Sequence, residues 1–244
     1  MPENNSPFDR RKFLQSSALL ASTVAASGLM GFPFLASAAQ GRVGTMASPN
    51  GPYVLTHPST APMLDGLYMI GPRDGYSPYI GSLVSMMNYN RSTIIALTKG
   101  MTMEQLDHLQ DPTSNTIGAL LMHLAAVDWY YNIHTFGDMK KVPKEEQDFW
   151  DPAMNLGDKG RQSIRGHELP YYVDLLTATR EKTLTALKGK DDQWLLSEDP
   201  LYSNKETKFN YYWEWFHVCE HESHHRGQMA WLKKRVPGIK AGDD

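Results

Sequence analysis

Apolar residues return at helical spacing in the first long segment after residue 76. Between Ile80 and Leu97 they recur every three or four positions, which is the spacing of one face of an α-helix. Ser77 is a favourable N-cap, Pro78 suits the first helical position, and Gly100 follows the last periodic residues. The pattern therefore predicts a helix that begins after Ser77 and ends before Gly100.

Three further segments show the same periodicity. One follows "QDPTSNT", where Ser114 or Asn115 can cap, and runs through "IGALLMHLAAVDWYYNIHTF". Another covers "ELPYYVDLLTATREKTLTALKG" and closes at Gly189, and the last spans about Asn210 to Arg235, ahead of a Val-Pro-Gly sequence. Four amphipathic helices without alternating strands predict an all-α fold, an antiparallel four-helix bundle.

The segments outside these helices are rich in residues that break helices. Residues 137–166 are charged and punctuated by Pro and Gly, so we expect a short helix and loops there. Residues 39–76 are denser still in Gly and Pro, which predicts an extended strap or linker before the bundle. The bundle itself is expected to occupy residues 77–244.

The first 38 residues have the three parts of a bacterial export signal. Arg10 and Arg11 precede Lys12-Phe13-Leu14, a Ser- and Gly-containing apolar run follows, and Ala36-Ser37-Ala38 offers a cleavage site. The paired arginines resemble the twin-arginine consensus, with Asp9 where Ser or Thr is commoner. We therefore expect residues 1–38 to be removed during export through the twin-arginine pathway to the periplasm, leaving no stable membrane anchor. The alternative is an uncleaved anchor, for which the apolar run is short.

Composition narrows the classes of partner. The chain has 244 residues, 41% of them hydrophobic and 21% charged, with a formal net charge of -3, which is ordinary for a globular protein. There is no clustered stripe of Lys and Arg, so nucleic acid is not an expected partner. The single cysteine, Cys219, excludes an internal disulfide.

The last predicted helix contains four of the nine histidines in "FHVCEHESHHRGQMAW". At about 100° per residue, several polar residues fall within about 40° of His221, and apolar side chains flank this stripe. A buried polar group without a partner costs about 1–3 kcal/mol, and a divalent cation satisfies several imidazoles at once. His221 and His225, four residues apart, have the spacing that chelates zinc from one helix face. The polar stripe comprises Asn210, Glu214, His217, His221, His225 and Gln228.

A further ligand must come from another helix, and the second helix offers His123. A lone histidine on an apolar stripe is more often a satisfied core residue than a ligand. Here the small residues Ala119 and Ala126 allow two helices to approach closely, as a bridging metal requires. We therefore predict that His123, His221 and His225 bind one ion.

The stretch from His221 to His225 also matches the HExxH pattern of zinc proteases in its letters. No His or Glu follows His225 to serve as a downstream ligand, and no edge strand is predicted that would hold a peptide. Glu222 lies about 100° around the helix from His221, and we expect it to form a surface salt bridge. The protease hypothesis is therefore disfavoured.

Two stretches together, "NTIGALLMHLAAVDWYY" and "WFHVCEHESHHRGQM", resemble the DinB/YfiT-like superfamily of metal-binding four-helix bundles. The resemblance implies the same ligands, His123, His221 and His225, with Arg226-Gly227-Gln228 as the trailing motif. Asp128 stands where we would expect Glu, and the strap looks like a feature of an exported branch. The family implies a divalent ion, commonly zinc or nickel, with open coordination positions, and activities that include transferases and isomerases using low-molecular-weight thiols.

Two functional hypotheses remain, beside a plain bundle whose histidines are packed polar residues. One is an exported metalloenzyme, a hydrolase or transferase that activates a water or thiol, with His217, His224 and Gln228 supporting the ligands. The other is a non-catalytic or metal-stapled protein whose site His217 or Glu214 completes. A periplasmic location disfavours the cytosolic thiols of relatives, so an unspecified hydrolytic or transfer reaction on a small molecule is ranked above thiol transfer. Pairing of two copies into a homodimer is a further expectation.

Overall fold

The computed structural model describes residues 66–239, in which helices are the regular elements and strands are absent. The predicted export signal and most of the predicted strap lie outside the described residues. The elements are α2 (Pro78–Thr98), α3 (Met103–Leu106), α4 (Ile117–Phe136), the 3-10 helix η1 (Met139–Lys141), α5 (Lys144–Asn155), α6 (Gly157–Ser163), α7 (Leu169–Lys188), α8 (Asp192–Leu196) and α9 (Tyr211–Lys233).

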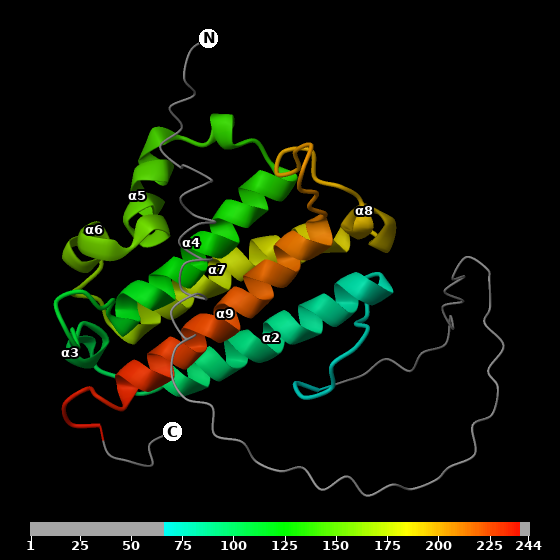
Figure 1. Ribbon diagram of the computed structural model, residues 1–244. Coiled ribbons are helices and arrows are strands. Elements are labelled where there is room, and N and C mark those ends of the chain that lie inside the picture. The colour runs from blue at the N-terminus through cyan, green and yellow to red at the C-terminus, as the bar shows by residue number, and fades with distance from the viewer. Residues whose placement is uncertain (1–65, 240–244) are drawn as a thin grey trace, which may run out of the picture. The chain divides into compact units, whose positions relative to one another are not determined.

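The four long helices α2, α4, α7 and α9 pack side by side as a bundle (Figure 1). The predicted all-α four-helix bundle is therefore confirmed. Figure 1 shows that α4 and α7 run in one direction and α2 and α9 in the opposite direction. Because α4 and α7 are parallel neighbours, the segment that joins them must return along the bundle. The connection that carries α5 and α6 does this (Figure 1).

The predicted helix boundaries hold closely, but two capping groups differ from the prediction. Ser77 is the N-cap residue of α2, yet its side chain does not cap the helix. Asp192 of α8 does so instead, because its Oδ1 accepts hydrogen bonds from the backbone N–H of Tyr79 at 3.0 Å and of Ile80 at 3.2 Å. At the start of α4 the cap is Thr116, whose Oγ1 accepts from the N–H of Ala119 at 3.0 Å. It is neither Ser114 nor Asn115.

The connection between α4 and α7 is more helical than its Pro and Gly content suggests. One short helix with loops was predicted, whereas residues 137–166 contain η1, α5 and α6. Pro152 lies inside α5 without ending it, and the helix ends before Leu156, where φ is 52°. The segment packs against α4, so it covers a part of the bundle that would otherwise face solvent.

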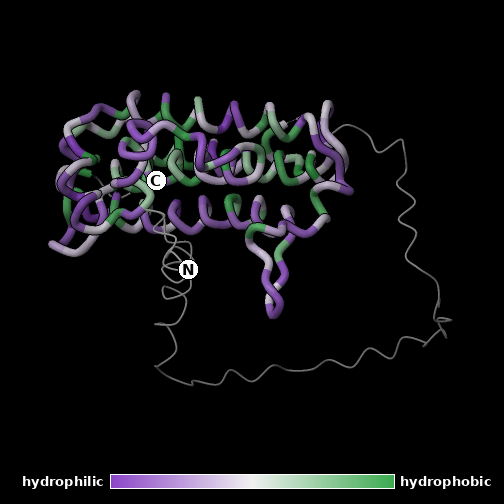
Figure 2. Tube along the Cα trace, turned by 90° about the horizontal axis from the view of Figure 1, so that it is seen from above, coloured by the Kyte–Doolittle hydropathy of each residue, from purple (hydrophilic) through white to green (hydrophobic). Residues whose placement is uncertain are grey.

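Helix α4 is the centre of the core because α5, α7 and α9 all contact it. Every residue from Ile117 to Tyr131 is buried, and hydrophobic and hydrophilic positions alternate around the outer helices (Figure 2). The α4–α7 approach requires Gly118, since an added Cβ would lie 2.8 Å from the hydroxyl of Tyr172. In the described part of the chain, no helix combines the length and apolarity that a membrane crossing needs.

A network of four buried charged side chains links the four bundle helices. Arg91 of α2 and Arg180 of α7 each donate to Oδ2 of Asp128 on α4 at 2.9 Å. Both arginines also donate to Glu222 of α9, and Arg180 Nη2 lies 2.9 Å from its Oε2. Two positive and two negative charges therefore meet in a region where Asp128 is 0% and Glu222 1% exposed.

The ionisation of the network follows from this pairing. Burial alone would raise the pKa of Glu222, but Arg180 and Arg91 outweigh it and hold the pKa below its usual value. Burial opposes the charge of Arg180 as well, yet Asp128 and Glu222 raise its pKa above the ordinary value. The two positive charges therefore balance the two negative charges, and the loss of one group leaves an uncompensated buried charge.

We expect Asp128→Asn to destabilise the metal-free protein by about 3–5 kcal/mol, because two buried guanidinium groups then share a single carboxylate. Urea unfolding followed by circular dichroism measures this free energy. Lys208→Gln is the matched control, since its ion pair with Glu198 lies on the surface and its loss should leave the unfolding midpoint nearly unchanged. Equal unfolding midpoints for the two variants would contradict the role of the network.

Candidate metal centre

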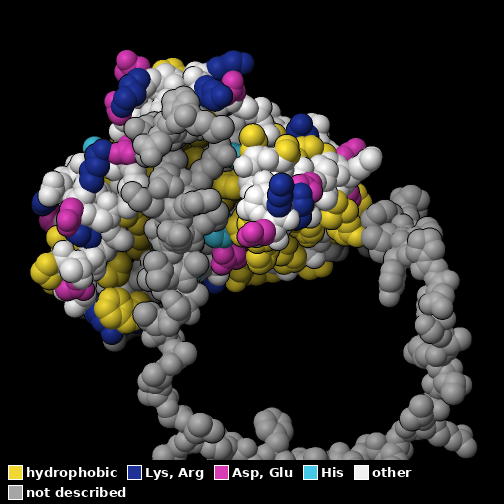
Figure 3. Space-filling view, turned by 45° about the horizontal axis from the view of Figure 1, so that its top comes forward, with side chains coloured by type: hydrophobic (Ala, Val, Ile, Leu, Met, Phe, Trp, Pro, Cys, Tyr) yellow, Lys and Arg dark blue, Asp and Glu magenta, His cyan; other side chains and the backbone are white. Residues whose placement is uncertain are grey.

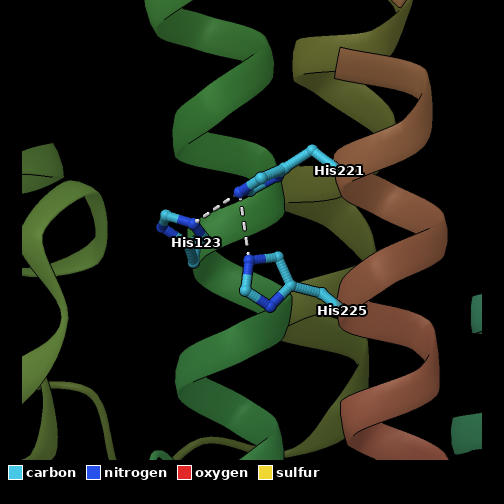
Figure 4. A group of neighbouring side chains, drawn as sticks. All are labelled: His123, His221 and His225. Carbon is cyan, nitrogen blue, oxygen red and sulfur yellow. Dashed lines mark hydrogen bonds between the residues drawn. The ribbon is translucent and has the colours of Figure 1, made fainter. Parts of the chain in front are cut away.

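Three imidazole rings meet between α4 and α9. Figure 4 shows His123 reaching from α4 and His221 and His225 from α9, with their rings turned toward one another. The Nε2 atom of His221 lies 3.3 Å from Nε2 of His123 and 3.0 Å from Nε2 of His225. Nitrogen ligands about 2.0–2.1 Å from a tetrahedral zinc are about 3.3 Å apart, so the spacing fits a shared ion.

The tautomers of the outer two rings are set by their other nitrogens. Nδ1 of His123 lies 2.7 Å from the carbonyl oxygen of Ala153, and Nδ1 of His225 lies 2.8 Å from Oε1 of Gln228. Both partners are acceptors, so each Nδ1 carries the proton and donates it. Each Nε2 is then left with a lone pair that faces His221, which is the arrangement found around metal-binding histidines.

His221 cannot donate a proton to the Nε2 lone pairs of both His123 and His225. A neutral imidazole carries one N–H, so Nε2 of His221 offers at most one proton to two acceptors. Its Nδ1 is buried and has no hydrogen-bond partner among residues 66–239. A cation between the three Nε2 atoms would use all three lone pairs, so the residues present fit a divalent metal.

Burial keeps these rings in the neutral form that binds metals. It lowers the pKa of His123 to about 4, against an opposing effect of the hydrogen bond to Ala153. It lowers the pKa of His225 to about 3 and that of His221 well below 6.5, where neighbouring imidazoles add to the effect. The three side chains are 5–7% exposed, and at neutral pH no proton competes for the site.

The supporting residues predicted from the sequence occupy three different environments. Gln228 accepts from His225 and also contacts Nε2 of the exposed His224 at 2.9 Å through its own amide nitrogen. His217 is turned aside, with Nδ1 2.9 Å from Oε1 of Glu220 and its ring stacked on Trp213. Gln228 is thus hydrogen-bonded to His225, a member of the histidine group.

The structure corrects the expectation for Glu222 and explains the HExxH pattern. Glu222 is buried in the charge network with Arg91 and Arg180, and it does not form a surface salt bridge. The correction has a simple cause, since α9 contacts both α2 and α4 and the face that bears Glu222 is therefore interior. Held there, this carboxylate faces away from the histidines. A zinc protease would need it beside them to act as a base.

Sequence reasoning missed the carbonyl of Ala153 on α5 as the partner of His123. Residue type carries no signal for this contact, since every residue has a backbone carbonyl. The contact depends on the way α5 folds back onto α4. The closed four-ligand alternative also receives no support, because neither His217 nor Glu214 joins the histidine group in the described residues.

A pocket of about 480 Å³ adjoins the centre through Gln228 and His224. Its walls combine apolar side chains with a few polar groups, as small-molecule sites do. In Figure 3, small areas of histidine (cyan) reach the surface, one of them beside hydrophobic side chains (yellow). The lining residues are Ser114, Asn115, Leu120, His224, Gly227, Gln228, Trp231 and Leu232.

Comparison with known proteins agrees with this geometry. The model of the family described as mycothiol-S-transferase matches residues 82–238, a span that contains all three histidines. Among solved structures, a conserved protein from Enterococcus faecalis matches at 14% identity and a TM-score of 0.52, covering 64% of this chain and 96% of that one. That likeness concerns the fold alone, and no curated protein matches the chain.

The family match runs from the first turns of α2 to beyond the end of α9 and includes both helices that supply the imidazoles. The resemblance read from the two histidine-containing stretches is therefore confirmed. The chain belongs to the mycothiol-S-transferase family, a DinB/YfiT-like family of metal-binding four-helix bundles.

Proposed function

We propose that this protein is a metal-dependent transferase that joins a low-molecular-weight thiol to an organic electrophile. The observation that carries the proposal is the convergence of three neutral Nε2 atoms, two of them with tautomers set by Ala153 and Gln228. His123, His221 and His225 would hold the ion, for which zinc and nickel are the best candidates. Such an ion lowers the pKa of a bound thiol or water and so supplies a nucleophile at neutral pH.

The ligand count favours a catalytic over a structural centre. Among residues 66–239 the group contains three protein ligands, whereas structural zinc sites are closed by four. A coordination position on the ion therefore remains for a small molecule. The matched family is named for thiol transfer, which favours a thiol over water as that molecule and outweighs the argument against thiols that the predicted periplasmic location supplies.

The residues around the centre have separate tasks in this proposal. Ala153 and Gln228 orient the imidazoles of His123 and His225, and burial excludes the protons that would compete. The adjoining pocket offers the apolar walls of Leu120 and Trp231 to the electrophile. In the reaction R–SH + R′–X → R–S–R′ + HX, a carbon–sulfur bond forms, the carbon–X bond breaks, and the thiol proton leaves with X.

A graded series of variants tests the metal centre. We expect His221→Ala to lose one equivalent of bound divalent ion relative to the unaltered protein. Gln228→Ala should retain the ion with about 10- to 100-fold weaker affinity, because it removes a hydrogen bond that orients His225. Metal analysis of protein purified without a polyhistidine tag, followed by titration with Zn²⁺, measures both effects.

His108→Ala is the control for this series, since His108 is a histidine outside the cluster. At a Zn²⁺ concentration about 100 times Kd, the melting temperature of the unaltered protein and of His108→Ala should rise by about 5–10 °C. An unchanged metal content in His221→Ala would refute the proposed centre.

The transfer reaction is tested with a small thiol and an aryl halide. We expect the metal-loaded protein to form the thioether and release halide, and chelated protein or His221→Ala to lose this activity. Trp231→Ala should raise KM for the electrophile about tenfold, or ~1.4 kcal/mol, through lost apolar contact. Phe149→Ala on α5 removes an exposed aromatic residue away from the pocket and serves as the control. Metal-dependent ester hydrolysis without thioether formation would instead assign a hydrolase.

We also propose that the protein acts outside the cytoplasm, on the basis of the paired arginines and the Ala-Ser-Ala sequence at residues 36–38. Replacement of Arg10 and Arg11 by Lys should leave the uncleaved chain in the cytoplasm, because the twin-arginine pathway reads this pair. Fractionation of a bacterial host that has the pathway measures the distribution. Unchanged periplasmic delivery of the double variant would argue for another route.

A further inference from the structure

A second buried group of metal-binding side chains lies at the other end of the α4–α9 contact. It consists of His134 near the end of α4, Asp199 in the segment between α8 and α9, and Glu214 in the first turn of α9. One ligand atom from each of these residues lies within 4.8 Å of the other two. All three residues are buried, and Asp199 and Glu214 are 0% exposed.

Asp199 is held in a fixed orientation toward His134. Its backbone N–H donates to the carbonyl of Phe209 at 2.9 Å, and its Oδ1 accepts from the N–H of Leu201 at 2.7 Å. Oδ2, the other carboxylate oxygen of Asp199, takes no part in these contacts and lies 2.7 Å from Nε2 of His134. A nitrogen and an oxygen from distant parts of the chain are therefore presented side by side.

Glu214 faces the same point, and its carboxyl group makes no close hydrogen bond. Its Oε2 lies 3.7 Å from Nε2 of His134, and neither carboxyl oxygen has a hydrogen-bond partner in the described part of the chain. A buried polar group without a partner is costly and needs an explanation. Burial and the neighbouring Asp199 raise the pKa of Glu214 to about 9, so without another cation this carboxyl keeps its proton at neutral pH.

We propose that His134, Asp199 and Glu214 bind a second divalent cation of the zinc class through one imidazole nitrogen and two carboxylate oxygens. Zinc accepts both kinds of ligand at about 2.0–2.2 Å. A divalent ion also balances the charge of two carboxylates, so the buried cluster becomes neutral as a whole. The ion takes the place of the proton that Glu214 otherwise shares with Asp199.

The second site is separate from the first. His134 lies eleven positions after His123 on α4, about 16 Å along a helix, and Glu214 lies seven positions before His221, about 10 Å along α9. Two ions that act on one reacting group lie about 3.5–4 Å apart. The second ion therefore does not share the chemistry of the first. It ties the segment that carries Asp199 to α4 and α9.

The surroundings agree with a structural role. The ring centroid of Tyr202 lies 4.3 Å from that of His134, and the ring of Tyr130 stacks against His134 with a centroid distance of 6.0 Å. The hydroxyls of these two tyrosines bond to each other at 3.1 Å. The cluster is thus enclosed by aromatic side chains, and it has no pocket comparable to the one beside the histidine centre among the pockets described.

Zinc stoichiometry of the mature, untagged protein tests the proposal. Glu214→Gln is the informative variant, because the amide has the shape of the protonated acid and can donate to Asp199 in its place, but it is a poor zinc ligand. We expect the unaltered protein to bind two equivalents of Zn²⁺ and Glu214→Gln to bind one. Glu206→Gln changes an exposed carboxylate in the same segment and should retain both.

The two sites can be told apart in the same experiment. His221→Ala should lose the histidine-centre ion and keep the second, and X-ray absorption of the zinc that remains should show one imidazole among oxygen ligands. Equal zinc content in Glu214→Gln and the unaltered protein would overturn the second site, whatever His221→Ala does. That result would mean that a proton shared between Glu214 and Asp199 holds the cluster together. Zinc lost from Glu214→Gln alone would support the second site and refute the first.

Discussion

The buried network of Arg91, Asp128, Arg180 and Glu222 is the interaction on which the rest of the bundle depends. Each of the four helices contributes one charge, so none can rotate about its axis without exposing a buried ion. Glu222 follows His221 directly, and a residue turns the helix by about 100°. With Glu222 held by the arginines, His221 has to face α4. The orientation of the histidine centre is therefore a consequence of electrostatic pairing on the neighbouring face.

The same constraint explains why a protease-like pattern does not make a protease site. In the HExxH signature the two histidines hold zinc and the glutamate serves as base. Here the histidines keep their spacing, but two arginines neutralise Glu222 in the interior. Support for the ligands comes instead from Gln228 on the same helix and from the carbonyl of Ala153 on α5. The same sequence pattern therefore serves different functions in different folds, because packing decides which partner each side chain contacts.

The contact between α4 and α9 is a polar seam inside an apolar bundle. It carries the histidine centre at one end and the group of His134, Asp199 and Glu214 at the other. Polar groups in such a seam need partners, since unpaired buried groups are costly. In this bundle two arginines neutralise the buried carboxylates, and a backbone carbonyl and a side-chain amide accept from the histidines. In our proposals, divalent ions bind at the histidine centre and at the second group.

The sequence alone determined which segments form the four long helices, about where these begin and end, and that His221 and His225 lie on one helix face, because periodicity and capping are local properties. Asn210 caps the start of α9 with its side chain, and Gly189 follows the last residue of α7. Only the tertiary structure decided that Asp192 caps α2, that Ala153 orients His123, and that Glu222 is interior. It alone also brought Asp199 to His134 across 65 positions. These contacts join residues far apart along the chain through a backbone group or a buried charge, and no spacing within one helix records them.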